Sequence, residues 1–272
     1  MLVDVIRVPA YDAAALERAI LANGPDTIAA FIAEPVGGSS SGALVPLAGY
    51  LRRVRDICTR HEVLFVADEI LVGAGRTGTW SALEPEQVVP DLQVLGKGIA
   101  AGFAPLAAVL APSRIVDAFE RGSGAFNHAQ TFSHHAVSCA AGTATLRYLR
   151  QHKLIDRCAR LGATLHARLG DLRDSRNVGA IRGRGLLAGI ELVDAETRAP
   201  FPRGAHFAEE VTRAALDSGL VVWPNVGHVN GTLGDLVMLA PPYIVTEDEI
   251  DQIVERLGHA ITVAVQHLSV RS

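Results

Sequence analysis

The sequence has few aromatic residues, few cysteines and no long uninterrupted apolar run. Aromatic residues account for 5% of its 272 residues. The cysteines, Cys58, Cys139 and Cys158, are odd in number and lack the spacing of a metal site. Thiols of this kind are typical of reduced cytoplasmic proteins, so we expect a cytoplasmic protein with no metal.

The sequence also lacks segments that would carry it into or across a membrane. The first ten residues contain Asp4 and Arg7, which the apolar stretch of a signal peptide would not have. The most apolar segment, residues 99–112, contains glycine and proline and is too short to span a bilayer. The formal net charge of −4 gives no electrostatic reason to expect nucleic acid or an acidic membrane as a partner.

Apolar residues, by contrast, are abundant, at 49% of the chain. Residues 27–33 and 63–67 are continuous apolar runs of strand length, with a helical repeat between them at 47–58. Two further strands are expected at residues 92–95 and 106–110. This alternation predicts an α/β fold built on a parallel-rich sheet.

The second half of the chain has a different pattern. Long helical repeats are followed by short strands and a final amphipathic helix. The helices are expected at residues 136–150, 153–173 and 207–218, and the strands at 186–193, 220–223 and 236–239. We therefore predict two domains, residues 1–150 and a smaller α+β domain at residues 151–272.

Three charged residues stand near the carboxyl ends of predicted strands. Glu34, Asp68 and Lys97 follow the first, second and third strand. Ligands of open parallel sheets bind outside these ends, so we expect the three side chains to face one crevice. A lysine between Gly96 and Gly98 with a carboxylate nearby suits a Schiff-base lysine and an acidic partner for a pyridinium nitrogen. A surface ion pair explains the same geometry equally well.

Two nucleotide-binding patterns resemble short parts of the chain. The run VLFVADE, residues 63–69, is similar to the strand and acidic pair that hold magnesium in nucleotide hydrolases, but no phosphate loop G-x-x-x-x-G-K-[ST] accompanies it. Gly183, Gly185 and Gly189 do not have the spacing of a dinucleotide fingerprint. Both interpretations are therefore set aside.

Longer blocks of sequence carry a family resemblance. Six occur in order: FIAEPVGGSSSGALVP (31–46), FVADEILVGAGRTGTW (65–80), LGKGIAAGFAPLAAV (95–109), HAQTFSHHAVSCAA (128–141), IRGRGLLAGIEL (181–192) and DLVMLAPPYIVTEDEID (235–251). Together they resemble the C-terminal two-thirds of class III (ω-type) aminotransferases, which use pyridoxal 5′-phosphate (PLP). The resemblance implies the PLP-transferase fold type I, with residues 1–150 as the C-terminal part of the large PLP-binding domain and 151–272 as the small C-terminal domain.

The resemblance implies roles for five residues. Lys97 matches the lysine that bonds to the cofactor and later moves the proton between substrate and cofactor. Asp68 matches the carboxylate that keeps the pyridine nitrogen protonated, and Ile70 matches the residue packed on one face of the ring. Thr131 matches a threonine that reaches the cofactor phosphate of the neighbouring subunit, which implies a dimer. Glu34 matches a glutamate near the substrate.

The chain departs from the family at three positions. Leu71 stands where many members have a glutamine that bonds the ring oxygen, and Ala136 stands where relatives usually have proline. Members acting on α-amino acids have a carboxylate-binding arginine just before Pro-Pro, but the run VMLAPP is apolar around Met238. An arginine would bind a carboxylate bidentately. Its absence predicts amine or ω-amino acid donors, with a 2-oxo acid or aldehyde as acceptor.

Other polar residues in these blocks are expected to be structural. The histidines could be mistaken for metal ligands, and the arginines are typical of the family as ion-pair or turn residues. They are His128, His134, His135, Arg76, Arg182 and Arg184.

The family's N-terminal part has no counterpart in this sequence. That part supplies a glycine–serine loop for the phosphate and an aromatic ring that stacks on the cofactor, and neither is found in residues 1–24. The sheet would then have an open apolar edge. We expect a homo-oligomer or a hetero-oligomer in which a separate chain supplies the N-terminal half. A fragment of a longer protein or a non-catalytic remnant would account for the same sequence.

Two functions other than amino transfer stay open. One is a scaffold or regulatory subunit that keeps the fold without turnover. The other is a PLP-dependent aminomutase or racemase on the same framework. Because a remnant has no chemical need for Lys97 or Asp68, their presence favours catalysis.

Overall fold

The computed structural model describes residues 4–271, which form two compact units. The first unit comprises the chain up to Pro35, Pro46–Ala74 and Trp80–His152. The second comprises Val36–Val45, Gly75–Thr79 and the chain from Lys153 onward. Two short segments of the first half of the sequence thus belong to the second unit.

The first unit contains a four-stranded sheet with the strand order β1-β2-β3-β4. Its strands are β1 (Ala30–Ala33), β2 (Leu64–Asp68), β3 (Leu92–Leu95) and β4 (Ala108–Leu110). The first three are parallel, and β4 pairs with β3 in the antiparallel direction. The predicted α/β fold with a parallel-rich sheet is therefore confirmed.

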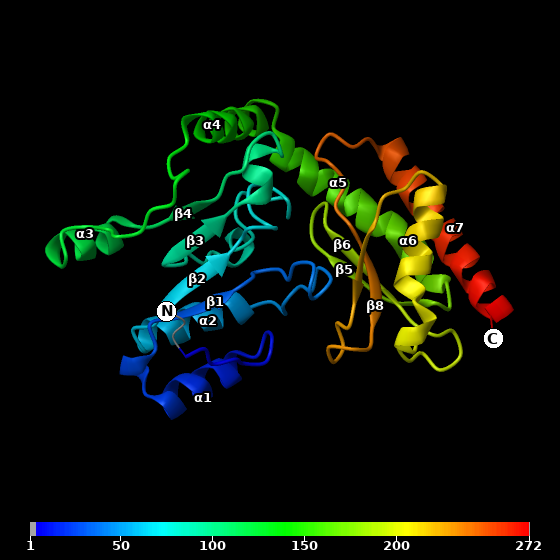
Figure 1. The fold of residues 1–272 in the computed structure, drawn as a ribbon, viewed down its shortest axis with the longest axis horizontal. Helices are drawn as coiled ribbons and strands as arrows, with labels where there is room; N and C mark the ends of the chain where they lie inside the picture. Colours follow the sequence, from blue (N-terminus) through cyan, green and yellow to red (C-terminus); the bar gives the residue numbers. More distant parts are fainter. Residues whose placement is uncertain (1–3, 272) are drawn as a thin grey trace. The chain divides into compact units, whose positions relative to one another are not determined.

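Helices α1 and α2 cover one side of this sheet and form its core (Figure 1). The helices of the unit are α1 (Ala13–Asn23), α2 (Tyr50–Arg60), α3 (Ser113–Arg121) and α4 (Ala136–Gln151), with 3₁₀ turns η1 (Pro25–Thr27), η2 (Glu84–Glu86) and η3 (Lys97–Ala100). Asp12 caps α1 by accepting a hydrogen bond from the amide of Ala15 at 2.8 Å. Leu16, Leu51 and Phe65 are among the side chains buried between the two helices and the sheet.

The second unit contains an antiparallel sheet with the order β5-β6-β8-β7. Its strands are β5 (Val178–Gly183), β6 (Ala188–Leu192), β7 (Trp223–Val226) and β8 (Asp235–Leu239). Its helices are α5 (Leu154–Leu169), α6 (Phe207–Asp217) and α7 (Glu247–Arg271), with 3₁₀ turns η4 (Gly170–Asp174) and η5 (Arg203–Ala205). Apolar residues of the three α-helices and the strands form one core. No helix within residues 4–271 has the length and apolar character needed to cross a bilayer.

Three expectations for the second unit are wrong in detail. Strand β5 was not expected, because Gly179 and Gly183 weaken the strand signal. The predicted strand at 220–223 instead forms as β7 at Trp223–Val226, where Pro224 is tolerated on an edge strand. The predicted helix at 153–173 ends as α5 at Leu169 and continues as the turn η4.

Candidate active site

Lys97 stands immediately beyond the carboxyl end of β3, where the chain turns sharply. Gly96 separates it from the strand, and Lys97 begins η3 with a φ of 42°. This left-handed backbone conformation is uncommon for a residue with a side chain. The lysine side chain is exposed. The turn therefore presents a primary amine at the carboxyl edge of the parallel strands, where open α/β sheets bind their ligands.

Asp68 is the last residue of β2, the strand next to β3. In the register of the sheet it is the partner of Val94, three residues before Lys97. Its Oδ1 accepts a hydrogen bond from the amide of Ile70 at 3.1 Å, which limits rotation of the half-buried carboxylate. The carboxylate and the amine thus belong to one edge of two adjacent strands.

Glu34 follows β1 at the same edge of the sheet. The last residue of β1, Ala33, is the register partner of Ala67, so Glu34 and Asp68 each follow a member of this last pair. Its side chain is half-buried. Of the five predicted site residues, Glu34, Asp68 and Lys97 therefore stand at the carboxyl ends of β1, β2 and β3, respectively.

Ile70 packs beside the lysine turn. A Cβ atom on Gly96 would lie 3.2 Å from the Cγ2 atom of Ile70, which is tighter than ordinary contact between side chains. Glycine at this position therefore lets the isoleucine side chain approach the backbone just before Lys97. A branched apolar group, an amine and a carboxylate are the chemical groups that the sequence predicted for a PLP site.

The class III aminotransferase family model matches residues 8–261. The chain belongs to this family. It is 40% identical over 255 residues to an uncharacterized aminotransferase of Schizosaccharomyces pombe, covering 93% of this chain and 56% of that protein. It is 39% identical over 249 residues to an omega-aminotransferase of Caulobacter vibrioides, covering 90% of this chain and 54% of the relative.

Solved transaminase structures have the same fold. A transaminase from the marine bacterium Virgibacillus superposes with a TM-score of 0.87 at 32% identity, covering 94% of this chain and 57% of that one. An amine transaminase from an uncultivated Pseudomonas species, solved in its PLP-bound form, gives a TM-score of 0.85 at 37% identity over 93% and 56% of the two chains. The predicted family and fold type are confirmed. This class III chain spans about half the length of the relatives that it matches.

Thr131 lies in an exposed turn between α3 and α4. Within residues 4–271 its hydroxyl makes no hydrogen bond. Its role in phosphate binding stays a prediction.

Sequence reasoning missed Glu69, which holds the loop behind the aspartate. Its carboxylate accepts hydrogen bonds from the hydroxyl of Ser81 and from the amide of Ala82 at 3.0 Å, and the residue is 1% exposed. Burial raises the pKa of Glu69, although these hydrogen bonds oppose the shift. Its amide also donates to the carbonyl of Val94 at 2.9 Å. The sequence did contain a signal for this role. Glu69 is an acidic residue that stands between a buried strand and the apolar residues that follow it.

Two of the arginines expected to be structural form hydrogen bonds or an ion pair within the second unit. Arg76 donates to the carbonyls of Leu186 and Pro241 at 2.9 and 2.6 Å. Arg182 forms an ion pair with Glu191 at 3.0 Å. These two groups are occupied in holding the fold.

The histidines near Thr131 show no metal site. His135 precedes α4 and its Nδ1 accepts from the amide of Ser138 at 3.4 Å, as a helix cap does. No group of three metal-ligating side chains lies together among residues 4–271.

Proposed function

We propose that this chain is the lysine-bearing part of a PLP-dependent aminotransferase. The observation that carries the proposal is that Asp68 ends β2 and Lys97 closely follows the adjacent parallel strand β3, with the lysine side chain exposed. The residues fit the cofactor: an amine that can bond to its aldehyde, a carboxylate for its ring nitrogen, and Ile70 for one face of its ring. When bound, PLP supplies an electron sink for the carbanion formed at the substrate.

The chain's own residues then handle binding and proton transfer. Lys97 would hold the cofactor through its Nζ, and its amine, when free, would accept a proton from the substrate and return it. The carboxylate of Asp68 would face the ring nitrogen of a bound cofactor, where a negative charge favours the protonated form of that nitrogen. The Ile70 amide fixes the direction of that carboxylate. Ile70 itself excludes water from one side of the ring.

The proposed amino donors lack an α-carboxylate. Met238 is buried in β8, and its neighbours in the run VMLAPP are also uncharged. A carboxylate is usually bound by arginine, whose planar guanidinium matches both oxygens. We therefore assign amines and ω-amino acids as donors and a 2-oxo acid or aldehyde as acceptor. Glu34, half-buried at the strand edge, is placed to contact the donor.

A donor panel tests this function and its specificity together. We expect β-alanine, a terminal diamine or an arylalkylamine to transfer its amino group at least about tenfold faster than alanine or glutamate, the effect of one missing bidentate contact. Product is measured by chromatography in the complete assembly, with glyoxylate as acceptor, because its product glycine differs from all five donors. Glutamate as the best donor would show that another arginine binds the carboxylate. Transfer from none of the five amines would favour the scaffold instead.

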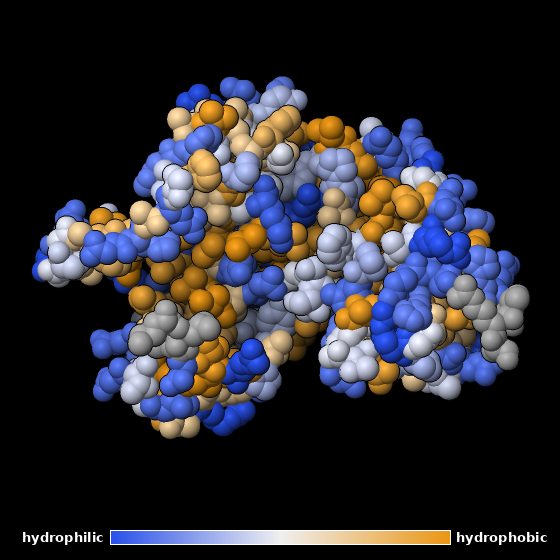
Figure 2. Space-filling model, in the orientation of Figure 1, coloured by the Kyte–Doolittle hydropathy of each residue, from blue (hydrophilic) through white to orange (hydrophobic). Residues whose placement is uncertain are grey.

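The assembly is proposed to contain a second polypeptide that resembles the N-terminal part of the relatives. The chain spans about half of their length, and its first unit leaves apolar side chains uncovered. Ile32 of β1 is 65% exposed, and Val109 and Leu110 of β4 are 61% and 52% exposed. Figure 2 shows this apolar surface over the sheet of the first unit. Exposed apolar strand edges pair with another strand or aggregate.

Helix α3 supports the same assembly. None of its residues is buried, although Val116 and Phe119 lie on one apolar side of it. An amphipathic helix gains its stability from packing of that side. The proposed assembly has this chain at least twice, since Thr131 is assigned to the neighbouring subunit's cofactor.

Co-expression tests the assembly. Purified alone, this chain is expected to bind PLP weakly and to show no amino transfer, because the phosphate loop lies in the other half. Co-expression with a chain that resembles the N-terminal half of the relatives should restore both, as measured by cofactor absorbance and product formation. Light scattering should find at least two copies of this chain in the active species. Full activity of this chain alone would contradict the proposal.

A further inference from the structure

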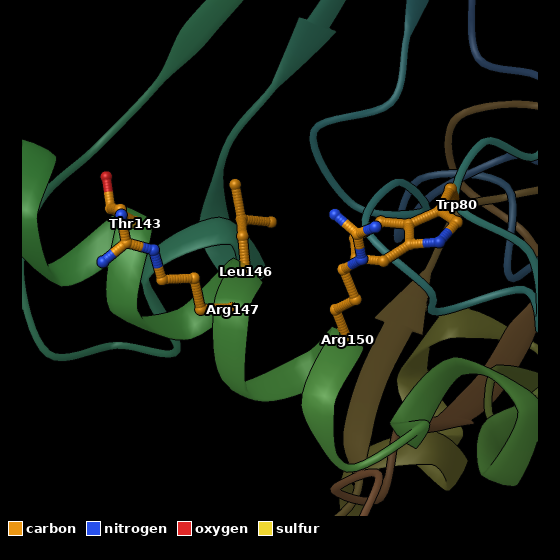
Figure 3. Close-up of a pocket in the computed structure, with 5 residues that line it drawn as sticks. All are labelled: Trp80, Thr143, Leu146, Arg147 and Arg150. Carbon is orange, nitrogen blue, oxygen red and sulfur yellow. The ribbon is translucent and has the colours of Figure 1, made fainter.

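A groove of about 530 Å³ lies along the C-terminal half of α4 in the first unit. One wall is the helix, and the other is Trp80, from the loop before η2 (Figure 3). The helix contributes Thr143, Leu146, Arg147 and Arg150, which follow one another at helical spacing and therefore share one face. None of the five predicted PLP-site residues lines this groove.

The groove carries two positive charges that the protein does not neutralise. Within residues 4–271, neither Arg147 nor Arg150 forms an ion pair or a side-chain hydrogen bond. The sequence around them explains this, because no carboxylate occurs between Glu120 and Asp156. Both side chains are exposed and flexible, and each can bring its positive charge to an anion in the groove. The groove is therefore suited to an oxyanion.

A second groove of the same unit shows the opposite arrangement. Arg55 and Arg114 both line it, and both bind Asp91, the first at 2.7 Å. The carboxylate of Asp91 also accepts a hydrogen bond from the amide of Phe65. The arginines of that groove are thus occupied by the protein's own anion. The α4 groove also has two arginines, but no carboxylate of the described residues binds them.

The remaining lining residues indicate what else the ligand carries. Trp80 is 42% exposed and Leu146 is 39% exposed, so a flat apolar surface and an aliphatic side chain face the groove. Thr143 donates its hydroxyl hydrogen to the carbonyl of Cys139 at 2.8 Å, so its oxygen can only accept. Figure 3 shows Arg150 reaching from α4 toward the Trp80 ring. The two arginines are therefore the groups that can bind an anion, and the tryptophan is the group on which a ring can pack.

We propose that the α4 groove binds a small ligand in which a carboxylate or a phosphate is attached to a planar ring. Figure 3 draws the two guanidinium groups apart, that of Arg147 beside Thr143 and that of Arg150 beside Trp80, so both flexible side chains turn toward the oxyanion when it binds. Each guanidinium can donate two parallel hydrogen bonds to it. The ring lies on the indole of Trp80. The helix dipole accounts for a cation at the end of α4, where Arg150 stands, but not for a second arginine or an exposed indole beside it.

Tryptophan fluorescence can report on this groove directly. The chain has two tryptophans, so Trp223→Phe leaves Trp80 as the reporter within this chain. The active complex that carries this change, loaded with PLP, is titrated with phenyl phosphate, with benzoate and with the uncharged benzyl alcohol. The same complex with Trp80→Phe added gives the emission of the second polypeptide, which is subtracted. We expect saturable changes in Trp80 emission with the two anions and not with the alcohol. The stronger of the two anions identifies the phosphate or the carboxylate as the natural group.

The arginine variants decide whether the groove is the binding site. Arg147→Gln and Arg150→Gln should each weaken the anion about tenfold, and the double variant should lose saturable binding below about 10 mM, the effect of deleting charge-assisted hydrogen bonds. Arg53→Gln, which removes an exposed arginine from α2, is the matched control and should bind as the parent does. Circular dichroism checks that the helices persist.

Three outcomes would overturn the proposal. The first is no saturable change with either anion in the parent protein. The second is equal binding of benzyl alcohol, which would reduce the site to ring packing on Trp80. The third is an equal loss of binding in Arg53→Gln, which would assign the effect to net charge.

Discussion

Replacing Lys97 by alanine is expected to abolish amino transfer, with a loss of roughly a thousandfold or more. The change removes both the amine that bonds to the cofactor and the group that moves the proton. It should leave the fold intact, because the side chain is exposed and alanine at a φ of 42° replaces another residue with a Cβ atom. Turnover is measured in the complete assembly, and circular dichroism checks the fold.

The site of attachment can be mapped by covalent reduction. Borohydride treatment of the PLP-loaded protein followed by peptide mass mapping should place the cofactor on Lys97. Lys153 is the only other lysine, so Lys153→Arg is the matched control and should retain activity. An adduct on Lys153, or full activity of the alanine variant, would remove Lys97 from the mechanism.

The candidate site could be predicted from sequence because its residues stand at the ends of strands. A continuous apolar run identifies a buried parallel strand, and the polar residue that ends it must lie at the carboxyl edge. Asp68 needs only this rule, since it ends β2. Lys97 needs in addition the glycine that turns the chain after β3. The direction of the aspartate carboxylate could not be predicted from the sequence pattern. It is set by the hydrogen bond from the Ile70 amide, which depends on the geometry of the turn.

Other parts of the fold depend on long-range contacts that no local pattern contains. Residues Val36–Val45 and Gly75–Thr79 belong to the second unit although each lies between elements of the first. A close contact between two glycines illustrates why the first of these segments belongs to the second unit. A Cβ atom on Gly189 would lie 2.1 Å from the carbonyl oxygen of Gly42. Only glycine permits this approach of two backbones, and the two positions are far apart in sequence. The predicted division of the chain near residue 150 could not represent these segments.

Asp68→Asn is expected to reduce kcat by about a hundredfold or more while leaving the fold in place. The amide has the shape of the carboxylate, and its oxygen can still accept the hydrogen bond from the Ile70 amide. It lacks the negative charge that keeps the ring nitrogen protonated, so the ring becomes a weaker electron sink. Rates are compared in the complete assembly with the best donor of the panel, and thermal unfolding should change by only a few degrees.

A charge-matched control separates this effect from the loss of a surface charge. Asp56→Asn removes an exposed carboxylate from α2 and is expected to retain the parent rate. In Asp68→Asn the loss should fall on kcat more than on KM, because the charge acts on the electron sink rather than on the donor. The cofactor absorbance should also shift, since the ring nitrogen is no longer held protonated. A near-normal kcat with an unchanged spectrum would mean that Asp68 only supports the turn between β2 and Ile70.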